Sequence, residues 1–175
     1  EGWTPQEMEF TFESPSVSDL YLLQCRDMAM RERKKYRRFD PLNITSDKYL
    51  GHGIGIGGGA LSGRVVFSLE EIDLWRAREP DTLLILARSD TVPDDIREIH
   101  AADGLVTARG GVTSHASVVA HRLGKTCVVG CGDLECDERK KECTFKDRRI
   151  RSGDFISIDG QEGSIYAGKL NLMQE

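Results

Sequence analysis

His115 lies in the stretch GGVTSHASVVAHRLG, a few residues after two glycines and at the start of a predicted helix. The first turn of a helix leaves backbone N–H groups without intrahelical partners and carries the positive end of the helix dipole, so it binds anions. The dipole also disfavours the imidazolium form, so we expect His115 to be neutral at pH 7 and usable as a nucleophile. The predicted chemistry is attack of the imidazole on phosphorus, which gives a phosphohistidine.

The residues around His115 carry groups that can hold a phosphoryl oxygen. Two glycines allow close approach of the backbone, two hydroxyls can donate hydrogen bonds, and an arginine supplies a fixed charge. These predicted phosphate-binding residues are Arg109, Gly110, Gly111, Thr113 and Ser114. From spacing alone, a capping or core histidine is an equally good interpretation of residue 115.

Two further side chains on this helix could lie near the anion. His121 is six residues from His115 and therefore on another face of the helix, so it is not expected to share the site. Arg122, seven residues on, returns to the face of His115, although a solvated or ion-paired arginine explains it as well. His100 closes the preceding helix near its negative end, which is a structural reason for a histidine there.

The glycine-rich stretch GHGIGIGGGALSG satisfies G-x-G-x-x-G through Gly53, Gly55 and Gly58. A dinucleotide fingerprint needs a strand before it and a helix after it, whereas here a strand-like GRVVF follows. We interpret the stretch as a flexible connection into the domain and His52 as a solvent-exposed bystander.

The cysteines predict no metal centre. They form no C-x-x-C pair and have no histidine at zinc-like spacing. Their odd number without an export signal suggests reduced thiols, and Cys127, inside the apolar run TCVVG, should act as a small buried hydrophobe. The five are Cys25, Cys127, Cys131, Cys136 and Cys143.

Short strands and two helices must position these side chains. The runs GRVVF, TLLILAR, GLVTA, TCVVG, FISIDG and SIYAG have strand length and β-branched content. TVPDDIREIHAADG is a predicted helix in which Thr91 can cap the start and Pro93 fits the first turn. TSHASVVAHRLG is a second helix, opened by a Thr or Ser cap and closed by Gly124. Alternation over residues 82–130 predicts a partly parallel α/β core with a further β layer.

The first fifty residues have a different texture. MEFTF and LYLLQCR, joined by SPSVSD, predict two strands, and two strands alone are marginal in water. Residues 27 to about 50 are charged and contain Pro41 and NITSD, so they predict a helix followed by a linker. The run RERKKYRR could bind polyanions, but without an aromatic platform it is better interpreted as a solvated helical face or linker.

Composition restricts the class of protein. The chain has 175 residues, 39% hydrophobic and 30% charged, which predicts a soluble globular protein. A net charge of −5 gives no bulk attraction to nucleic acid. The absence of a membrane-length apolar run or signal peptide predicts a cytoplasmic protein with no membrane partner. Because the chain starts at Glu1 rather than Met, we expect it to be a piece of a longer protein.

The segment TARGGVTSHASVVAHRLGKTCVVGC resembles the phosphohistidine signature of the phosphoenolpyruvate-utilising enzymes: pyruvate phosphate dikinase, phosphoenolpyruvate synthase and enzyme I of the sugar phosphotransferase system. TARGG and GKTCVVGC look most like the dikinase, and GDFISIDGQEGSIYAG matches the closing strands. The resemblance covers roughly residues 53–170. It implies an α/β fold, the swivelling β/β/α three-layer phosphohistidine domain, over residues 53–175, with residues 39–52 as a linker.

PQEMEFTFE and LYLLQCR resemble the last hairpin of the ATP-grasp domain that precedes this domain in the dikinase and the synthase. By that resemblance, residues 1–38 are the C-terminal hairpin and helix of a truncated ATP-grasp nucleotide-binding domain. Glu9 would help to hold Mg²⁺, and Gln24 and Arg26 would contact nucleotide phosphates. The chain departs from the family in a longer SPSVSD loop and in His121, where an arginine is common.

The implied function is a phosphoryl relay in which His115 takes the β-phosphoryl group of ATP in one site and delivers it to pyruvate in another, giving phosphoenolpyruvate. The implied cofactor is Mg²⁺ at the ATP and pyruvate sites of the parent enzyme, none bound tightly by this fragment. The implied partners are the ATP-grasp and (β/α)₈-barrel domains of the parent, with ATP, phosphate and pyruvate. Alternatives are a synthase-type or enzyme I-type domain, a non-catalytic module that binds an anion or a partner, and nucleic-acid binding through RERKKYRR.

Overall fold

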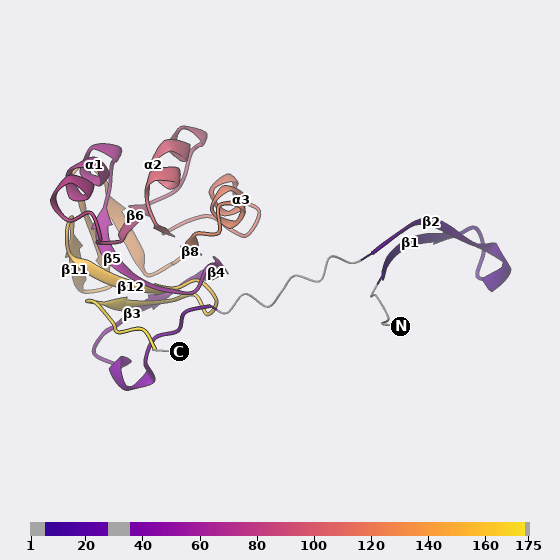
Figure 1. The fold of residues 1–175 in the computed structure, drawn as a ribbon, viewed down its shortest axis with the longest axis horizontal. Coiled ribbons are helices and arrows are strands. Elements are labelled where there is room, and N and C mark those ends of the chain that lie inside the picture. The colour runs from indigo at the N-terminus through magenta and orange to yellow at the C-terminus, as the bar shows by residue number, and fades with distance from the viewer. Residues whose placement is uncertain (1–5, 28–35, 174–175) are drawn as a thin grey trace. The chain divides into compact units, whose positions relative to one another are not determined.

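The computed structural model describes residues 6–27 and 36–173. The chain forms two compact units, Glu1–Lys35 and Tyr36–Glu175 (Figure 1). Among the described residues, no helix has the length and apolar character needed to span a membrane.

The first unit is an antiparallel hairpin of β1 (Gln6–Phe12) and β2 (Leu20–Asp27), joined by a loop with a short 3₁₀ turn. This confirms the two strands predicted from MEFTF and LYLLQCR. Large apolar side chains on both strands remain exposed, among them Phe10 (57%) and Leu23 (65%). The helix predicted after the hairpin falls mainly on residues 28–35, which lie outside the described residues.

The main sheet of the second unit has the strand order β3-β13-β12-β5-β6-β7-β8-β4. Strands β5 to β8 run parallel to one another, and the remaining pairs are antiparallel. The strands are β3 (Tyr49–His52), β4 (Ile54–Gly57), β5 (Ala60–Val66), β6 (Leu84–Arg88), β7 (Gly104–Thr107), β8 (Thr126–Val129), β12 (Phe155–Asp159) and β13 (Ser164–Ala167). All six strands predicted from apolar runs are therefore present.

The sheet closes on itself through the glycine-rich stretch. β3 and β4 occupy opposite ends of the strand order, yet only Gly53 separates them along the chain. A Cβ on Gly53 would lie 2.7 Å from the carbonyl oxygen of Val129, and its amide donates to Gly163 at 2.9 Å. Glycine is required where backbones approach this closely. The prediction of a flexible connection was wrong, because here the stretch forms the closing strands.

The predicted linker over residues 39–52 also belongs to the second unit. Phe39 is only 4% exposed and forms a β-bridge with Leu172, and a short 3₁₀ turn covers Pro41–Asn43. Leu50, in β3, is 4% exposed and lies in the main core. Pro41 and the turn residues resemble a linker in sequence, but Phe39 before them and Leu50 after them are buried.

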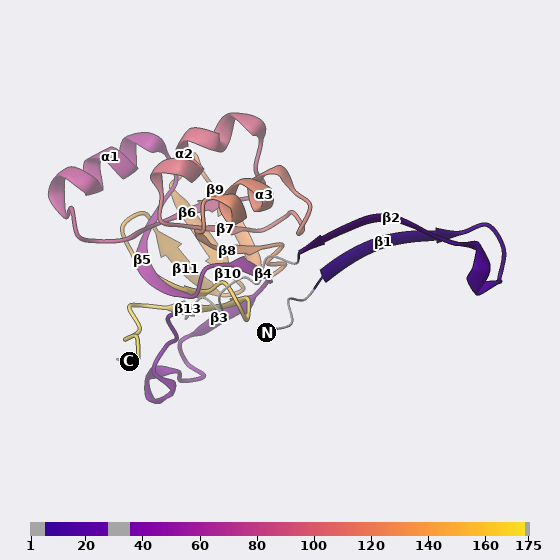
Figure 2. The same ribbon diagram turned by 45° about the vertical axis from the view of Figure 1, so that its right-hand side comes forward.

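Three helices cover one face of the parallel strands (Figure 2): α1 (Leu69–Arg78), α2 (Ile96–Ala101) and α3 (His115–Arg122). The second was expected to be capped by Thr91, but it follows a 3₁₀ turn, Pro93–Asp95, in which Asp95 Oδ2 accepts the Val92 amide at 2.8 Å. Helix α1 was not predicted. Ser68 caps it, and Ile72 and Trp75 pack on the sheet.

A separate antiparallel sheet consists of β9 (Leu134–Asp137), β10 (Glu142–Phe145) and β11 (Arg148–Arg151). Its inner face buries Leu134, Cys143, Phe145 and Ile150 in the main core. These strands were not predicted, because each is four residues long and at least half of its side chains are charged or polar.

Alternate residues of the parallel strands enter two different cores. On β6, Leu84 and Leu86 pack under the helices, whereas Ile85 and Ala87 face a second core with the inner residues of β12, β13 and the three-stranded sheet. Burial on both faces explains why these strands read as continuous apolar runs. Helices, parallel strands and antiparallel strands therefore form three layers, which confirms the predicted β/β/α fold.

Candidate phosphohistidine site

The loop between β7 and α3 leaves the carboxyl edge of the parallel strands. The amides of Ala108 and Arg109 donate to the carbonyls of Arg88 and Ser89 at 3.0 and 2.9 Å, so parallel pairing with the β6 segment continues past the end of β7. The hydroxyl of the buried Thr107 donates to the Arg109 carbonyl at 2.5 Å. The start of the loop is therefore fixed by a neighbouring strand.

The two glycines of the loop serve different purposes. Gly110 has φ of +106°, a conformation that residues with a side chain rarely adopt. Its carbonyl packs against Gly130, where a Cβ would lie only 2.7 Å from that oxygen. A Cβ on Gly111 would meet open space, with no described atom within 4 Å of it. The backbone at Gly111 is thus accessible to a ligand.

A network of two serines ties the loop to the helix. Ser114 is the N-cap of α3, and its Oγ accepts the Ser117 amide at 3.3 Å. The hydroxyl of Ser117, which is fully buried, donates to the Gly111 carbonyl at 2.8 Å. The two hydroxyl oxygens are 2.7 Å apart. Because Ser117 has a single hydroxyl hydrogen, Ser114 must be the donor between them.

This network changes the expected role of Ser114. Its one hydroxyl hydrogen is directed at Ser117, so it has none left to donate to a phosphoryl oxygen. Ser114 therefore acts as the helix cap rather than as the predicted hydroxyl donor. Thr113, which is exposed, is the hydroxyl of the TSH sequence that can reach an anion. The sequence analysis did not identify the parts played by Ser117 and Gly130, although Ser117 stands three residues after the Ser114 cap, a spacing at which a side chain can interact with the N-cap.

His115 is the first residue of α3, directly after the cap. The structure thus places the predicted residues of the loop in one continuous turn at a helix N-terminus, with Arg109 and Gly110 exposed beside it. Val112 (61% exposed) and Val118 (47%) flank the turn. A Cβ on Gly57 would lie 3.4 Å from His121 Cδ2, which places His121 beside β4. The interpretation of His115 as a capping residue fails, because Ser114 occupies that position.

Arg88, the last residue of β6, forms ion pairs near the start of the loop. The Arg88 guanidinium, 13% exposed, is 3.3 Å from Asp95 and 3.9 Å from Glu98, and it donates to the Phe67 carbonyl. Its Nε is buried and has no hydrogen-bond partner among the described residues. This ion pair joins the end of β6 to the start of α2, and so supports the loop segment against which Ala108 and Arg109 pair.

Residues 81–163, which contain the loop and α3, match the family described as PEP-utilising enzyme, mobile domain. These residues form a mobile domain of the PEP-utilising enzyme family. It is 42% identical over 126 residues to pyruvate, phosphate dikinase 1, chloroplastic, of Arabidopsis thaliana, covering 72% of this chain and 13% of the relative. It is 38% identical over 136 residues to pyruvate, phosphate dikinase of Clostridium symbiosum, covering 78% and 15%. The chain therefore spans less than a sixth of these relatives.

A solution structure of an Enzyme I protein is also similar. It is 25% identical, with a TM-score of 0.36, and the match covers 52% of this chain and 32% of that one.

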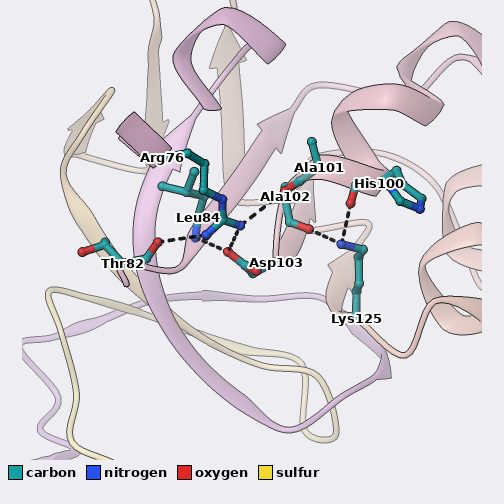
Figure 3. Close-up of polar contacts among 8 residues, drawn as sticks. All are labelled: Arg76, Thr82, Leu84, His100, Ala101, Ala102, Asp103 and Lys125. Carbon is teal, nitrogen blue, oxygen red and sulfur yellow. Dashed lines mark hydrogen bonds and ion pairs between the residues drawn. The ribbon is translucent and has the colours of Figure 1, made fainter. Parts of the chain in front are cut away.

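In this PEP-utilising domain, the opposite edge of the parallel strands is held by cations (Figure 3). Lys125 donates to the carbonyls of His100, at 2.8 Å, and Ala102, which end helix α2. Asp103 accepts from the Leu84 amide at 2.8 Å and from Arg76 at 2.7 Å. Desolvation lowers the pKa of Lys125. His100 is thus part of a helix C-terminus, as expected, and this network is structural.

The predicted nucleotide and metal residues lie in the hairpin of the first unit. Glu9 on β1 is directly opposite Gln24 on β2, and both are exposed. Arg26 is two residues further along β2, opposite Glu7. Among the described residues there is no group of three or more His, Cys, Asp or Glu that could hold a metal. One carboxylate suits Mg²⁺ only when substrate phosphates supply other ligands.

Proposed function

We propose that this chain is the phosphoryl-carrier part of a pyruvate phosphate dikinase-like phosphotransferase, in which His115 shuttles a phosphoryl group between an ATP site and a pyruvate/phosphoenolpyruvate site. One observation carries the proposal. The first residue of α3 is a histidine, and it follows a fixed loop that contains an accessible glycine, Gly111. Such a turn suits a nucleophile that must meet a phosphoryl group and then release it to a second site.

The chemistry follows from the helix start. A neutral imidazole at residue 115 has a lone pair with which to attack phosphorus. As the phosphoryl group transfers, its oxygens gain interactions with amides of the first turn and with the Arg109 guanidinium. The Thr113 hydroxyl adds a hydrogen bond. Fixing the loop through the Ser114–Ser117 pair before the reaction reduces the reorganisation needed in the transition state.

Features of the hairpin favour the proposal that it is part of a nucleotide site. Its exposed apolar side chains and two-strand size indicate a sheet completed by other parts of an ATP-grasp domain. The facing pair of Glu9 and Gln24 fits contact with a Mg²⁺-bound nucleotide, with Arg26 on a phosphate. Mg²⁺ would bridge the phosphate oxygens and neutralise charge there.

The complete cycle requires more than this chain. A pyruvate site on a (β/α)₈ barrel needs roughly 250 residues, and the dikinases named above are several times longer than the matched segment. We propose dikinase chemistry, with inorganic phosphate as the third substrate, over the synthase type because the identities are to dikinases. The cytoplasm stays the predicted compartment, although the Arabidopsis relative is described as chloroplastic.

Phosphorylation in trans tests the proposal. The chain is incubated with labelled phosphoenolpyruvate, Mg²⁺ and a dikinase whose own phosphorylatable histidine has been replaced by alanine. We expect one acid-labile, base-stable phosphate per chain, and none on a His115→Asn variant. Arg109→Gln should slow labelling without changing its extent. Labelling of His115→Asn at the native rate would refute the proposal, and so would a native chain that binds the dikinase but stays unlabelled.

A further inference from the structure

Two cysteines lie side by side on neighbouring strands of the three-stranded sheet. Cys136 on β9 is the direct register partner of Cys143 on β10. Both side chains are on the inner face, where Cys143 is 1% exposed and Cys136 is partly buried against the same core. Both cysteines are free.

Direct cross-strand partners have Cβ atoms about 4.5–5.5 Å apart. A disulfide requires about 3.5–4.5 Å, so a small approach of two strands is enough to connect them. We propose that Cys136 and Cys143 are a redox-sensitive pair that forms a reversible cross-strand disulfide. The hairpin loop between them is short, so the disulfide would change local geometry more than it would constrain the unfolded chain.

The oxidant is a small-molecule disulfide such as oxidised glutathione. The more exposed Cys136 loses its proton and attacks one glutathione sulfur, which gives a mixed disulfide and releases one glutathione thiolate. Cys143 then loses its proton and attacks the Cys136 sulfur, releasing the second. Two protein thiols are oxidised to one disulfide, one glutathione disulfide is reduced to two thiols, and the two protons pass to the released glutathiones.

The environment makes this oxidation slow at neutral pH. Interaction with the Cys143 thiol, together with burial, raises the pKa of Cys136. Because the thiolate is the attacking species, the rate should rise about tenfold for each pH unit below that pKa. The pair therefore stays reduced until the oxidant is abundant or the hairpin opens.

A chain of hydrogen bonds connects the cysteine pair to the phosphohistidine loop. The Cys136 carbonyl accepts from the Ser89 hydroxyl at 2.9 Å, and Glu138 on the same hairpin accepts the Ser89 amide at 2.7 Å. The Ser89 carbonyl in turn accepts the Arg109 amide at 2.9 Å. Drawing β9 toward β10 would displace the Cys136 carbonyl, and with it a support of the loop. This consequence rests on the proposed function of His115.

A peptide map tests the disulfide without reference to phosphoryl transfer. Trypsin cleaves after Arg139, Lys140 and Lys141, which lie between the two cysteines. A Cys25→Ser background, which removes the exposed cysteine, is treated with glutathione disulfide at pH 7, 8 and 9, alkylated and digested. We expect the peptide that contains Cys136 to be joined to ECTFK, lighter by two hydrogens, and separated by dithiothreitol. Cys136→Ser should abolish the link.

Three results would overturn the proposal: no joined peptide at pH 9, a glutathione adduct that never resolves, or a joined peptide that persists in Cys136→Ser. The functional arm measures labelling of His115 in the oxidised and re-reduced protein. We expect oxidation to slow it by about two- to tenfold, the range for one lost hydrogen bond. An unchanged rate with the disulfide formed would reject the coupling alone.

Discussion

Replacement of Ser117 by alanine should remove the hydrogen bonds that hold the phosphohistidine loop to the start of α3. The Ser117 hydroxyl is fully buried, donates to Gly111 and accepts from Ser114. Alanine removes both hydrogen bonds and leaves the Gly111 carbonyl without that donor. At about 0.5–1.5 kcal/mol for each bond, Ser117→Ala should lower the free energy of unfolding by about 1–3 kcal/mol. For a chain of this size that corresponds to roughly 2–4 °C in Tm per kcal/mol.

Urea denaturation followed by fluorescence measures this change, with the m-value expected to stay constant. Ser114→Ala and the double variant complete a thermodynamic cycle. Because the two hydroxyls are in direct contact, we expect a coupling energy of at least about 0.5 kcal/mol. Thr113→Ala is the matched control, since Thr113 is exposed beside the same cap and should change stability by less than about 0.5 kcal/mol. Additive effects of Ser114→Ala and Ser117→Ala, or a cost for Ser117→Ala no larger than that of the control, would refute the network.

Three other predictions concern the scaffold. Gly160→Ala should cost at least about 3 kcal/mol, because its Cβ would lie 1.8 Å from the Gly57 oxygen, whereas Gly132→Ala, with open space around it, should be near neutral in the same urea titration. Burial raises the pKa of Cys127 from 9.0 to about 12, so the unfolded chain releases this proton first as the pH rises. The contribution of Cys127 to stability should therefore be constant below pH 9 and fall by about 1.4 kcal/mol per pH unit between pH 9 and 12, and Cys127→Ala should remove that part of the slope. Lys125→Met should lower the free energy of unfolding by about 1–2 kcal/mol, because two carbonyls at the end of α2 lose their donor. Equal stability of Lys125→Met and the native chain would show that water replaces the amine.

The sequence was sufficient to predict those strands and helix ends that depend on their own residues. TLLILAR and TCVVG are buried on both faces, so their apolar runs predicted strands, and Gly124, with φ of +67°, ends α3 as expected. Helix α1 was missed because its buried side chains include Glu71, which accepts the Phe67 amide at 2.7 Å, and because half of its residues are charged. A buried glutamate stabilised by hydrogen bonds gives no apolar signal in a sequence.

Closure of the sheet could not be predicted from the residues of the glycine-rich stretch alone. Whether Gly53 and Gly160 form a flexible loop or a close backbone contact depends on strands more than 100 residues away, and glycine is common in both settings. The same limit applied to the site. The residue types around His115 indicated an anion, but the assignment of Ser114 to the cap depended on where the Ser117 hydroxyl is directed.

The most direct test of the central claim is to locate the phosphate on the chain. After labelling in trans from phosphoenolpyruvate, electron-transfer fragmentation at neutral pH distinguishes the His115 imidazole from the hydroxyls of Thr113 and Ser114. We predict the phosphate on His115 alone, lost on brief acid treatment and transferred back to pyruvate when the dikinase is re-added. An acid-stable phosphate on either hydroxyl, with His115 unmodified, would contradict the account.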